Sequence, residues 1–160
     1  MKLAVHAVGR MKSGPEKELA DRYFERFARS GPSIGLEFSG VAEIPESRAQ
    51  GAAERKREEA VRLRTLLGAA TALVLLDERG KNISSEEFAN RIGTLRDAGK
   101  RTLVIAIGGP DGHDPALREE AELVLSFGAL TWPHQIVRVM LAEQLYRAAT
   151  ILSGHPYHRS

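Results

Sequence analysis

A glycine-rich stretch, Gly108 to Gly112, holds the residues best suited to meet a ligand with their backbone. It reads Gly108-Gly109-Pro110-Asp111-Gly112 and directly follows an apolar run over residues 102–107. Paired glycines let a ligand or another backbone approach the main chain closely, with unhindered N–H groups as donors. A strand-to-helix turn that needs a positive φ would favour the same residues. The stretch is therefore a candidate binding loop, and a purely structural turn stays open as the alternative.

A second candidate is the connection from Ser126 to His134, which is rich in small, apolar and aromatic residues. Its central residues are Phe127, Gly128, Ala129, Leu130, Thr131 and Trp132. This composition is typical of a pocket for a flat apolar group. A loop folded beneath the core would have the same composition, and the residues alone do not choose between the two interpretations.

Side chains that could move a proton or contact a nucleic acid lie near the chain end. They are His134, Arg138, Tyr157, His158 and Arg159. A neutral imidazole accepts protons, a tyrosine ring stacks on an unstacked base, and a guanidinium contacts phosphate. The plain alternatives are that His134 only closes a helix start and that the chain end is disordered.

Several common site types are excluded by the motifs that are missing. Residues 9–14 have the glycine spacing of a phosphate-binding loop, but Pro15 and Glu16 stand where Lys and Ser or Thr would hold phosphate and magnesium. No G-x-G-x-x-G pattern follows a predicted strand, which argues against dinucleotide binding. The chain has no cysteine, and only His155 and His158 are closely spaced, so no metal site is expected.

The composition is typical of a globular protein. Of 160 residues, 42% are hydrophobic and 28% are charged, which excludes a disordered chain and a membrane protein. Lys and Arg number 23 against 21 Asp and Glu, so the net charge of +2 does not by itself indicate nucleic acid. No apolar run approaches the roughly 20 residues that span a bilayer, and the start carries no export signal. We therefore expect a cytoplasmic protein, and the absence of cysteine is compatible with a reducing compartment.

Short apolar runs alternate with segments of helical periodicity, and this alternation positions the candidate loops. Strands are expected at 3–8, 34–41, 71–76, 102–107 and 123–126. Helices are expected from Pro15 onward and at 47–67, 85–98, 115–122 and 134–152. Ser47 is expected to cap the second helix, with residues 54–59 on its solvated face. The pattern predicts one α/β domain over residues 1–160 with a mainly parallel sheet flanked by helices, and ligands bind beyond the carboxyl ends of such strands.

Four separated motifs occur in order along the whole chain. They are Leu76-Asp77, the run Ile107 to Gly112, the run Leu130 to His134 with Val137-Arg138-Val139 and Glu143 to Ala148, and His155-Pro156-Tyr157-His158-Arg159. Together they resemble the ribosomal RNA large-subunit methyltransferase H family of the SPOUT superfamily. The resemblance implies a trefoil-knotted α/β fold, which periodicity does not show. It also implies a homodimer that transfers a methyl group from S-adenosylmethionine to N3 of a pseudouridine in 23S ribosomal RNA on the ribosome, with no role for DNA.

The resemblance also implies roles for particular residues. Those expected to line the cofactor site are Leu76, Gly108, Gly109, Phe127, Gly128, Ala129, Leu130, Thr131 and Trp132. Phe127-Gly128 replaces the Leu-Ser expected in relatives, which puts a serine hydroxyl contact in question while backbone contacts survive. Those expected to serve catalysis and RNA binding are His134, Arg138, Tyr157, His158 and Arg159, with residues 154–160 as a functional tail.

Two other interpretations of the function stay open, and the last helix makes a separate prediction about assembly. A non-catalytic ribosome- or RNA-binding module would share the basic chain ends, but it would not need a glycine loop beside an apolar one. A doubly wound nucleotide enzyme would explain the alternation, yet the phosphate loop is missing. The last helix carries apolar residues on more than one face, which predicts a symmetric dimer whose tail reaches the partner's cofactor pocket. Those residues are Ile136, Val137, Met140, Leu141, Leu145 and Ile151.

Overall fold

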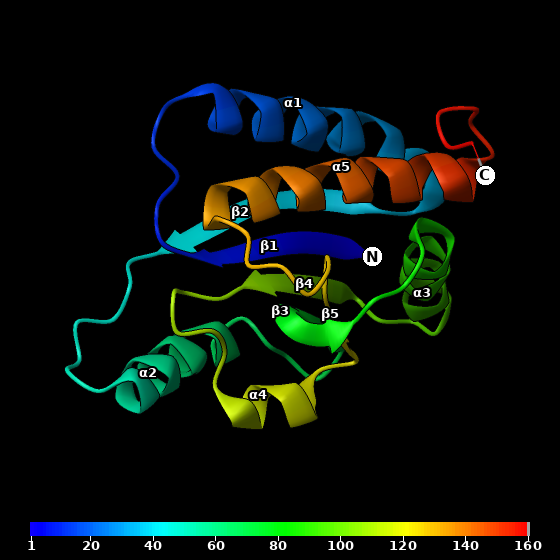
Figure 1. The fold of residues 1–160 in the computed structure, drawn as a ribbon. Coiled ribbons are helices and arrows are strands. Elements are labelled where there is room, and N and C mark those ends of the chain that lie inside the picture. The colour runs from blue at the N-terminus through cyan, green and yellow to red at the C-terminus, as the bar shows by residue number, and fades with distance from the viewer. Residues whose placement is uncertain (160) are drawn as a thin grey trace.

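The computed structural model describes residues 1–159 and contains a five-stranded sheet with helices on both faces (Figure 1). The strands are β1 (Lys2–Val8), β2 (Glu37–Ile44), β3 (Thr71–Lys81), β4 (Thr102–Ile107) and β5 (Leu123–Leu125). The helices are α1 (Pro15–Ser30), α2 (Ala52–Arg64), α3 (Ser85–Asp97), α4 (Pro115–Glu120) and α5 (His134–Ser153), with a short 3-10 helix at Gly31–Ile34. The predicted alternation of strands and helices is confirmed.

The sheet has the strand order β2-β1-β4-β3-β5, and every neighbouring pair is parallel. Ile107 of β4 is paired with Ala7 of β1 on one side and with Leu76 of β3 on the other. Leu76 is in turn paired with Leu125 of β5. The carboxyl ends of β1, β4 and β5 and Leu76 of β3 therefore lie along one edge of the sheet, toward which β1 runs in Figure 1.

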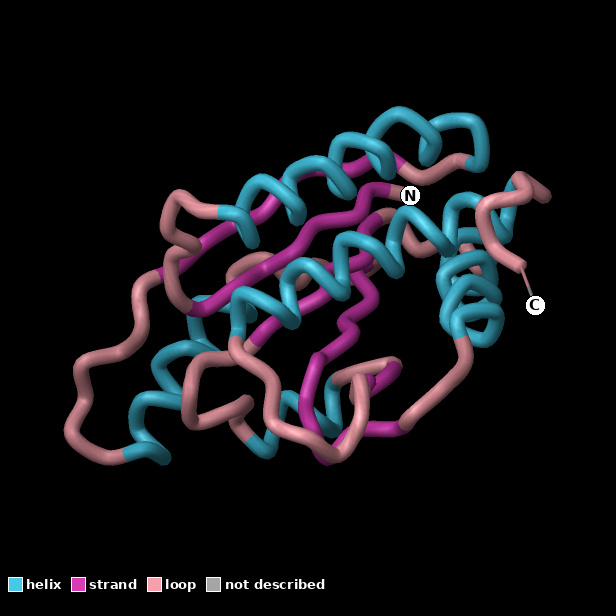
Figure 2. The backbone as a smooth tube through the Cα atoms, turned by 45° about the horizontal axis from the view of Figure 1, so that its top comes forward, coloured by secondary structure: helices cyan, strands magenta, loops and turns pink. Residues whose placement is uncertain are grey.

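The two faces of the sheet are covered unequally. Helices α1 and α5 lie side by side along one face, with α3 packed against α5, and α2 and α4 cover the other face (Figures 1 and 2). The α1/α5 face holds the larger core, in which Phe27, Leu141 and Leu145 are almost fully buried. The α2/α4 face holds a smaller core that includes Leu63 and Leu117. Among residues 1–159, no helix is long and apolar enough to cross a membrane.

Local capping signals fix several helix ends as predicted. The Ser84 hydroxyl accepts the Glu87 N–H at 3.1 Å, and the Asp114 carboxylate accepts the Ala116 N–H at 2.9 Å. Gly154 ends α5 with a left-handed φ of 71°, which glycine adopts without strain. These three positions follow from residue type alone.

The second strand and second helix differ from the sequence-based boundaries. A 3-10 turn over residues 31–34 delays β2, so the strand covers Glu37–Ile44 and not 34–41. Helix α2 starts after Gly51, and Ser47 is not its cap, because the Ser47 hydroxyl binds the Glu58 carboxylate. Glu59, expected on a solvated face, is only 7% exposed and accepts the Ser47 N–H at 3.0 Å. That hydrogen bond offsets the cost of burying the carboxylate.

The third strand runs five residues beyond its predicted end. After Leu76 the regular pairing breaks, and Lys81 then pairs with Leu125 of β5. Gly80 lies so close to β5 that a Cβ there would be 2.6 Å from the Val124 carbonyl oxygen. The polar residues after Leu76 hid this extension from the sequence pattern, and it forms one wall of the site described next.

Candidate functional site

A pocket opens at the carboxyl edge of the sheet, where the last part of β3 and the loops after β4 and β5 meet. Its volume is about 200 Å³. It is lined by Leu76, Asp77, Glu78, Arg79, Ile107, Gly108, Gly109, Pro110, Asp111, Gly112, Leu125, Phe127, Gly128, Leu130, Thr131, Trp132, His134 and Val137. The two loops that the sequence marked as candidates therefore border one cavity.

Gly108 and Gly109 pack tightly against the atoms behind them. A Cβ on Gly108 would lie 3.2 Å from the Gly112 carbonyl carbon and from the His113 ring. A Cβ on Gly109 would lie 3.1 Å from the Glu59 carboxylate and from the Val8 side chain. The structural need for glycine is therefore present, and the same two residues also line the pocket.

His113 and Asp77 connect the glycine loop to the end of β3. The His113 Nε2–H donates to the Leu76 carbonyl oxygen at 3.1 Å. Burial lowers the pKa of His113, although the charge of Asp77 opposes that effect, so the ring is neutral at physiological pH. Burial alone would raise the pKa of Asp77, but the Arg118 guanidinium, 2.6 Å away, and the Arg79 N–H together lower it. An ionised carboxylate in the pocket lining thus lies near a neutral imidazole that borders the small cavity behind the glycine loop.

Ser126 fixes the wall that follows β5. Its N–H donates to the Lys81 carbonyl at 2.9 Å, and its hydroxyl lies 3.0 Å from the Glu78 carbonyl oxygen. The same hydroxyl accepts the Gly128 N–H at 3.1 Å. The extended end of β3 and the apolar loop are therefore joined through one buried serine.

The apolar loop exposes large side chains at the rim. Leu130 is 71% exposed and Trp132 is 40% exposed, which is unusual for residues of this size. The Thr131 hydroxyl donates to Glu78 at 3.2 Å across the pocket wall. Of the nine residues expected to line a cofactor site, Ala129 alone is not among the lining residues, and its side chain is exposed. His134, at the first turn of α5, lines the same cavity.

Arg138 lies one turn further along α5 and points away from the pocket. Its guanidinium donates to Glu43 at 3.0 Å and to the Gly9 carbonyl at 3.3 Å, and the residue is only 8% exposed. Burial would raise the pKa of Glu43, but the Met11 N–H and Arg138 lower it. In this chain Arg138 joins α5 to the ends of β1 and β2, and its role in RNA binding stays a prediction.

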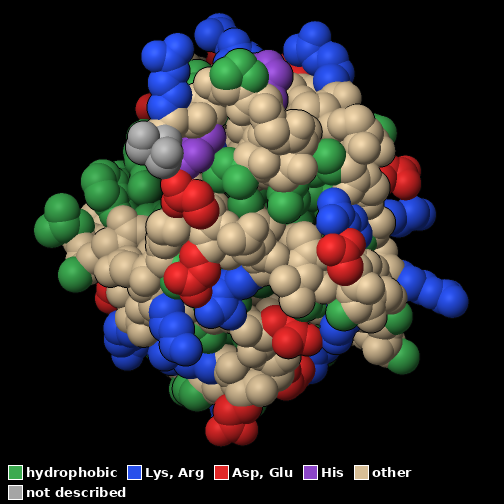
Figure 3. Space-filling view, turned by 90° about the vertical axis from the view of Figure 1, so that its right-hand side faces the viewer, with side chains coloured by type: hydrophobic (Ala, Val, Ile, Leu, Met, Phe, Trp, Pro, Cys, Tyr) green, Lys and Arg blue, Asp and Glu red, His purple; other side chains and the backbone are tan. Residues whose placement is uncertain are grey.

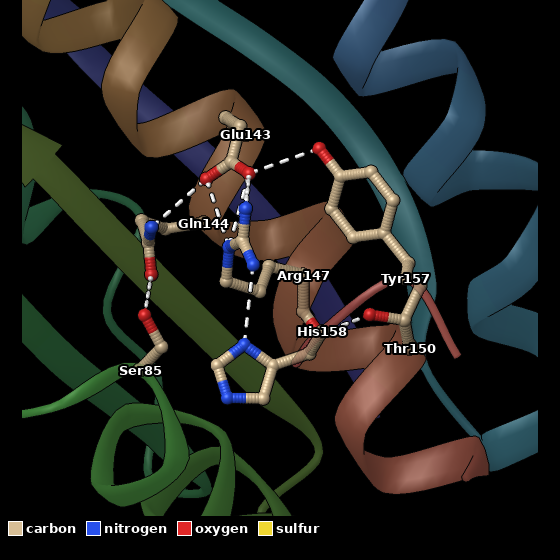
Figure 4. Close-up of polar contacts among 7 residues, drawn as sticks. All are labelled: Ser85, Glu143, Gln144, Arg147, Thr150, Tyr157 and His158. Atoms are coloured by element: carbon tan, nitrogen blue, oxygen red, sulfur yellow. Dashed lines mark hydrogen bonds and ion pairs between the residues drawn. The ribbon is translucent and has the colours of Figure 1, made fainter. Parts of the chain in front are cut away.

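The tail folds back on α5 and α3 (Figure 4). The Tyr157 hydroxyl donates to Glu143 at 3.1 Å, and its ring packs 4.7 Å from the Tyr146 ring. His158 contacts Arg147 through Nδ1 at 3.1 Å and Glu86 through Nε2 at 2.6 Å. Burial and hydrogen bonds raise the pKa of Tyr157, so the phenol stays protonated.

The tail and the pocket lie at different places along α5. His134 at the start of the helix lines the pocket, whereas Tyr157 contacts Glu143, nine residues later and about 14 Å along the helix axis. Within one chain Tyr157, His158 and the exposed Arg159 are therefore not brought to the pocket, and the final residue, Ser160, lies outside the described residues. On the face that carries α3 and the tail, basic, acidic and histidine side chains lie interspersed with apolar ones (Figure 3).

Sequence reasoning assigned no site role to three residues that shape the pocket. Asp77, His113 and Ser126 each join two of its walls. Their positions at the ends of strands were the available signal, but their partners depend on the strand order. Within residues 1–159, no group of three or more His, Cys, Asp or Glu side chains is placed to hold a metal ion.

The sequence of this chain matches a family model and several known proteins. A family model described as "Predicted SPOUT methyltransferase" matches residues 1–158. Proteins named ribosomal RNA large subunit methyltransferase H are similar over all of this chain and all of their own length: that of Mesorhizobium japonicum is 71% identical, and that of Brucella anthropi is 67% identical. Among solved structures, the SpoU methyltransferase AviRb from Streptomyces viridochromogenes, in complex with AdoMet, aligns with 92% of this chain and 59% of its own at 13% identity and a TM-score of 0.39. From the family match over residues 1–158 and the full-length relatives, the chain belongs to the SPOUT methyltransferase family.

Proposed function

We propose that the protein is an S-adenosylmethionine-dependent methyltransferase that acts on N3 of a pseudouridine in 23S ribosomal RNA. The observation that carries this proposal is that Gly108 and Gly109 line the same pocket as an apolar and aromatic loop. Relatives named as large-subunit rRNA methyltransferases, identical at up to 71% of positions over the full chain, support the reaction and the RNA.

The pocket residues fit the proposed cofactor. Gly108 and Gly109 have no side chain between the backbone and the ligand, so their peptide groups can approach it closely. Leu76, Leu130 and Trp132 supply apolar surface for a flat ring system. When bound, S-adenosylmethionine supplies a methyl group on a positively charged sulfonium.

The remaining work of this chain is alignment, water exclusion and control of one proton. The rim residues Leu130 and Trp132 would cover the reacting atoms and exclude water. The pseudouridine N3–H must lose its proton before or during transfer, and the His134 imidazole lines the pocket where an acceptor is needed. Asp77 is already paired with Arg118, so we assign it a structural role and not that of the proton acceptor.

We propose that the active form is a homodimer in which the tail of one chain completes the partner's pocket. Leu141 and Leu145 are buried in their own core, so the apolar surface left for a partner is narrower than the six residues of the sequence prediction. Val139 and Met140 of α5, together with Leu19 and Phe88, line a groove of about 630 Å³ that a second copy would fill. None of Tyr157, His158 and Arg159 lines the pocket of its own chain, which supports an arrangement that uses both chains.

The wider setting follows the same family. We propose that the protein acts in the cytoplasm on the ribosome as one domain over residues 1–160. The trefoil knot that the resemblance implies stays a prediction.

Mass mapping of 23S rRNA from cells with and without the gene tests the proposed reaction. We expect one methylpseudouridine to disappear on deletion and to return with the unaltered gene. Calorimetric titration of the purified protein with S-adenosylmethionine separates the interpretations, because a non-catalytic RNA-binding module would show no saturable binding. Unchanged rRNA in the deletion strain would contradict the proposed reaction.

A further inference from the structure

The Gly109–Gly112 turn is held by a helix that does not line the pocket. Within the turn, the Gly112 N–H donates to the Gly109 carbonyl at 2.9 Å, and Gly112 has a positive φ of 80°. Helix α2 lies beside the loop from β4 to α4 on the outer face of the sheet (Figure 1). The side chains of α2 are therefore the ones placed to hold the loop on this side.

Arg55 of α2 makes two hydrogen bonds to the turn. Its Nε and one terminal nitrogen donate to the two Asp111 oxygens at 2.6 and 3.0 Å. The other terminal nitrogen donates to the Ala49 and Gln50 carbonyls at 3.0 and 2.9 Å. A planar guanidinium that meets a carboxylate through two parallel bonds fixes orientation as well as distance. Arg55 also holds the pKa of Asp111 below its usual range, so the pair is ionised at neutral pH.

A second point of close approach lies one helical turn along α2. Glu59 is four residues after Arg55, and its carboxylate would be 3.1 Å from a Cβ on Gly109. Glu59 is itself held by the Ser47 N–H. Helix α2 thus binds the glycine turn through Arg55 and packs close to it at Glu59.

We propose that Arg55 is a positioning residue that holds the Gly109–Gly112 turn, through Asp111, in the conformation that receives the cofactor. The inference rests on the proposed function, because it takes the pocket to be the S-adenosylmethionine site. Preorganising a loop lowers the entropy lost when a ligand binds. A direct contact from Arg55 to an RNA phosphate is disfavoured, because each of its three nitrogens already donates within the chain.

The same helix offers a matched control. Arg64 of α2 donates to Glu120 of α4 at 2.6, 3.0 and 3.3 Å. This pair also joins α2 to the rest of the protein, but neither residue lines the pocket. If Arg55 only stabilised α2, Arg55→Met and Arg64→Met would have similar consequences.

The experiment measures S-adenosylmethionine affinity by calorimetry and amide hydrogen exchange at Gly112 in the cofactor-free protein. We expect Arg55→Met to weaken binding about tenfold and to speed exchange at Gly112, and Arg64→Met to change neither by more than twofold. Arg55→Lys, which keeps the charge but not the paired geometry, is expected to recover part of the affinity. In an Asp111→Asn background, Arg55→Met should have little further effect, because the two residues act as one unit.

The outcomes separate this inference from the proposed function. If the unaltered protein binds no S-adenosylmethionine, or a Gly108→Val variant binds it equally well, the site assignment fails. If those two behave as expected but Arg55→Met and Arg64→Met lower affinity equally, or the Arg55 and Asp111 effects add, the positioning role is wrong.

Discussion

The two ends of α5 differ in whether the polar side chains near them are already hydrogen-bonded within one chain. At its start, His134 and the loop with Leu130 and Trp132 border an open pocket. At its other end, Tyr157 and His158 already bind Glu143, Arg147 and Glu86. The pocket is therefore open to a ligand, whereas the proposed role of the tail requires it to act on a partner chain from this position or to exchange its contacts.

The largest effect should come from closing the pocket at Gly108. In Gly108→Val the side chain meets Gly112 and the His113 ring at 3.2 Å or less, so the turn must shift. We expect S-adenosylmethionine affinity to fall by more than 100-fold, on the order of 3 kcal/mol, while the protein remains folded. Calorimetry and circular dichroism measure the two quantities.

Gly68→Val is the matched control for that substitution. Gly68 precedes β3 at the opposite edge of the sheet, and a Cβ there would lie 3.8 Å from Thr71 Oγ1, an ordinary van der Waals distance. Its affinity should match that of the unaltered protein. A folded Gly108→Val variant with unchanged affinity would move the cofactor site away from this loop.

Deleting residues 155–160 should separate binding from transfer. The deletion removes the contacts of Tyr157 and His158 but little of the core, so cofactor affinity should change by no more than about threefold. Methyl transfer to ribosomes should fall about 100-fold, on the order of 3 kcal/mol of transition-state stabilisation. Transfer at the full-length rate would show that the tail is dispensable.

Mixing two inactive variants tests whether the tail acts on the partner chain. In a dimer of one tail-deleted chain and one Gly108→Val chain, the intact pocket and the intact tail belong to different chains. Such a dimer has a complete site only if the tail of one chain acts at the pocket of the other. Recovered transfer in the mixture supports a shared site. No recovery, with dimers shown by sedimentation, contradicts it.

The buried His6, in a small cavity behind the glycine loop, should make the protein less stable in mild acid. His6 is 2% exposed, and neither ring nitrogen has a hydrogen-bond partner within the described residues. Burial, and then the nearby His113, lower the pKa of His6 from 6.5 to about 4. The unfolded chain therefore takes up this proton first, and the free energy of unfolding falls as pH drops from 6.5 toward 4. The loss due to His6 between pH 7 and 5 is about 2 kcal/mol.

Urea unfolding of His6→Leu measures that contribution. We expect the variant to lose about 2 kcal/mol less than the unaltered protein between pH 7 and 5, whatever its stability at pH 7. His113, Glu59 and Lys56 line the same small cavity in both proteins. Parallel pH profiles for the two proteins would show that His6 is not the titrating group.

The smallest effect should distinguish the ring of Tyr157 from its hydroxyl. Tyr157→Phe keeps a ring beside Tyr146 and Arg147 but loses the 3.1 Å hydrogen bond to Glu143. If the ring stacks on a base, Phe should keep transfer within about threefold and Ala should lose about tenfold. Single-turnover methylation of ribosomes measures both. Equal losses for Phe and Ala would assign the effect to the hydroxyl.

Local signals made part of the fold predictable. Ser84 and Asp114 begin helices and Gly154 ends one, each through contacts with residues no more than four positions away. Their residue types are therefore enough to predict these helix ends. Glu59 was misassigned because its compensating donor, the Ser47 N–H, is 12 residues away and is brought to it only by folding. The extension of β3 was missed for a related reason, since Gly80 is required by its closeness to β5 and not by its own segment.

Part of the candidate site was likewise predictable from local signals, and part depended on the folded chain. The two loops of the pocket were found because carboxyl ends of parallel strands meet at one edge, and the family resemblance then named residues such as Leu76 and Trp132. The roles of His113 and Ser126 depend on β4 and β5 each lying next to β3, an order that periodicity does not contain. The tail's contacts with Glu143 and Glu86 likewise join segments that only the folded chain brings together.

The strand order also governs when the protein can complete itself during synthesis. β1 lies between β2 and β4, and Lys2 is paired with Thr102, so this pairing must wait for 100 more residues. At a synthesis rate of about 5 to 20 residues per second, the wait is on the order of 5 to 20 seconds. During it Leu3 and Val5, fully buried in the finished molecule, lack part of their cover. α1 waits longer still for α5, so a nascent chain that stops before residue 134 leaves its first helix without its main packing partner and is exposed to aggregation.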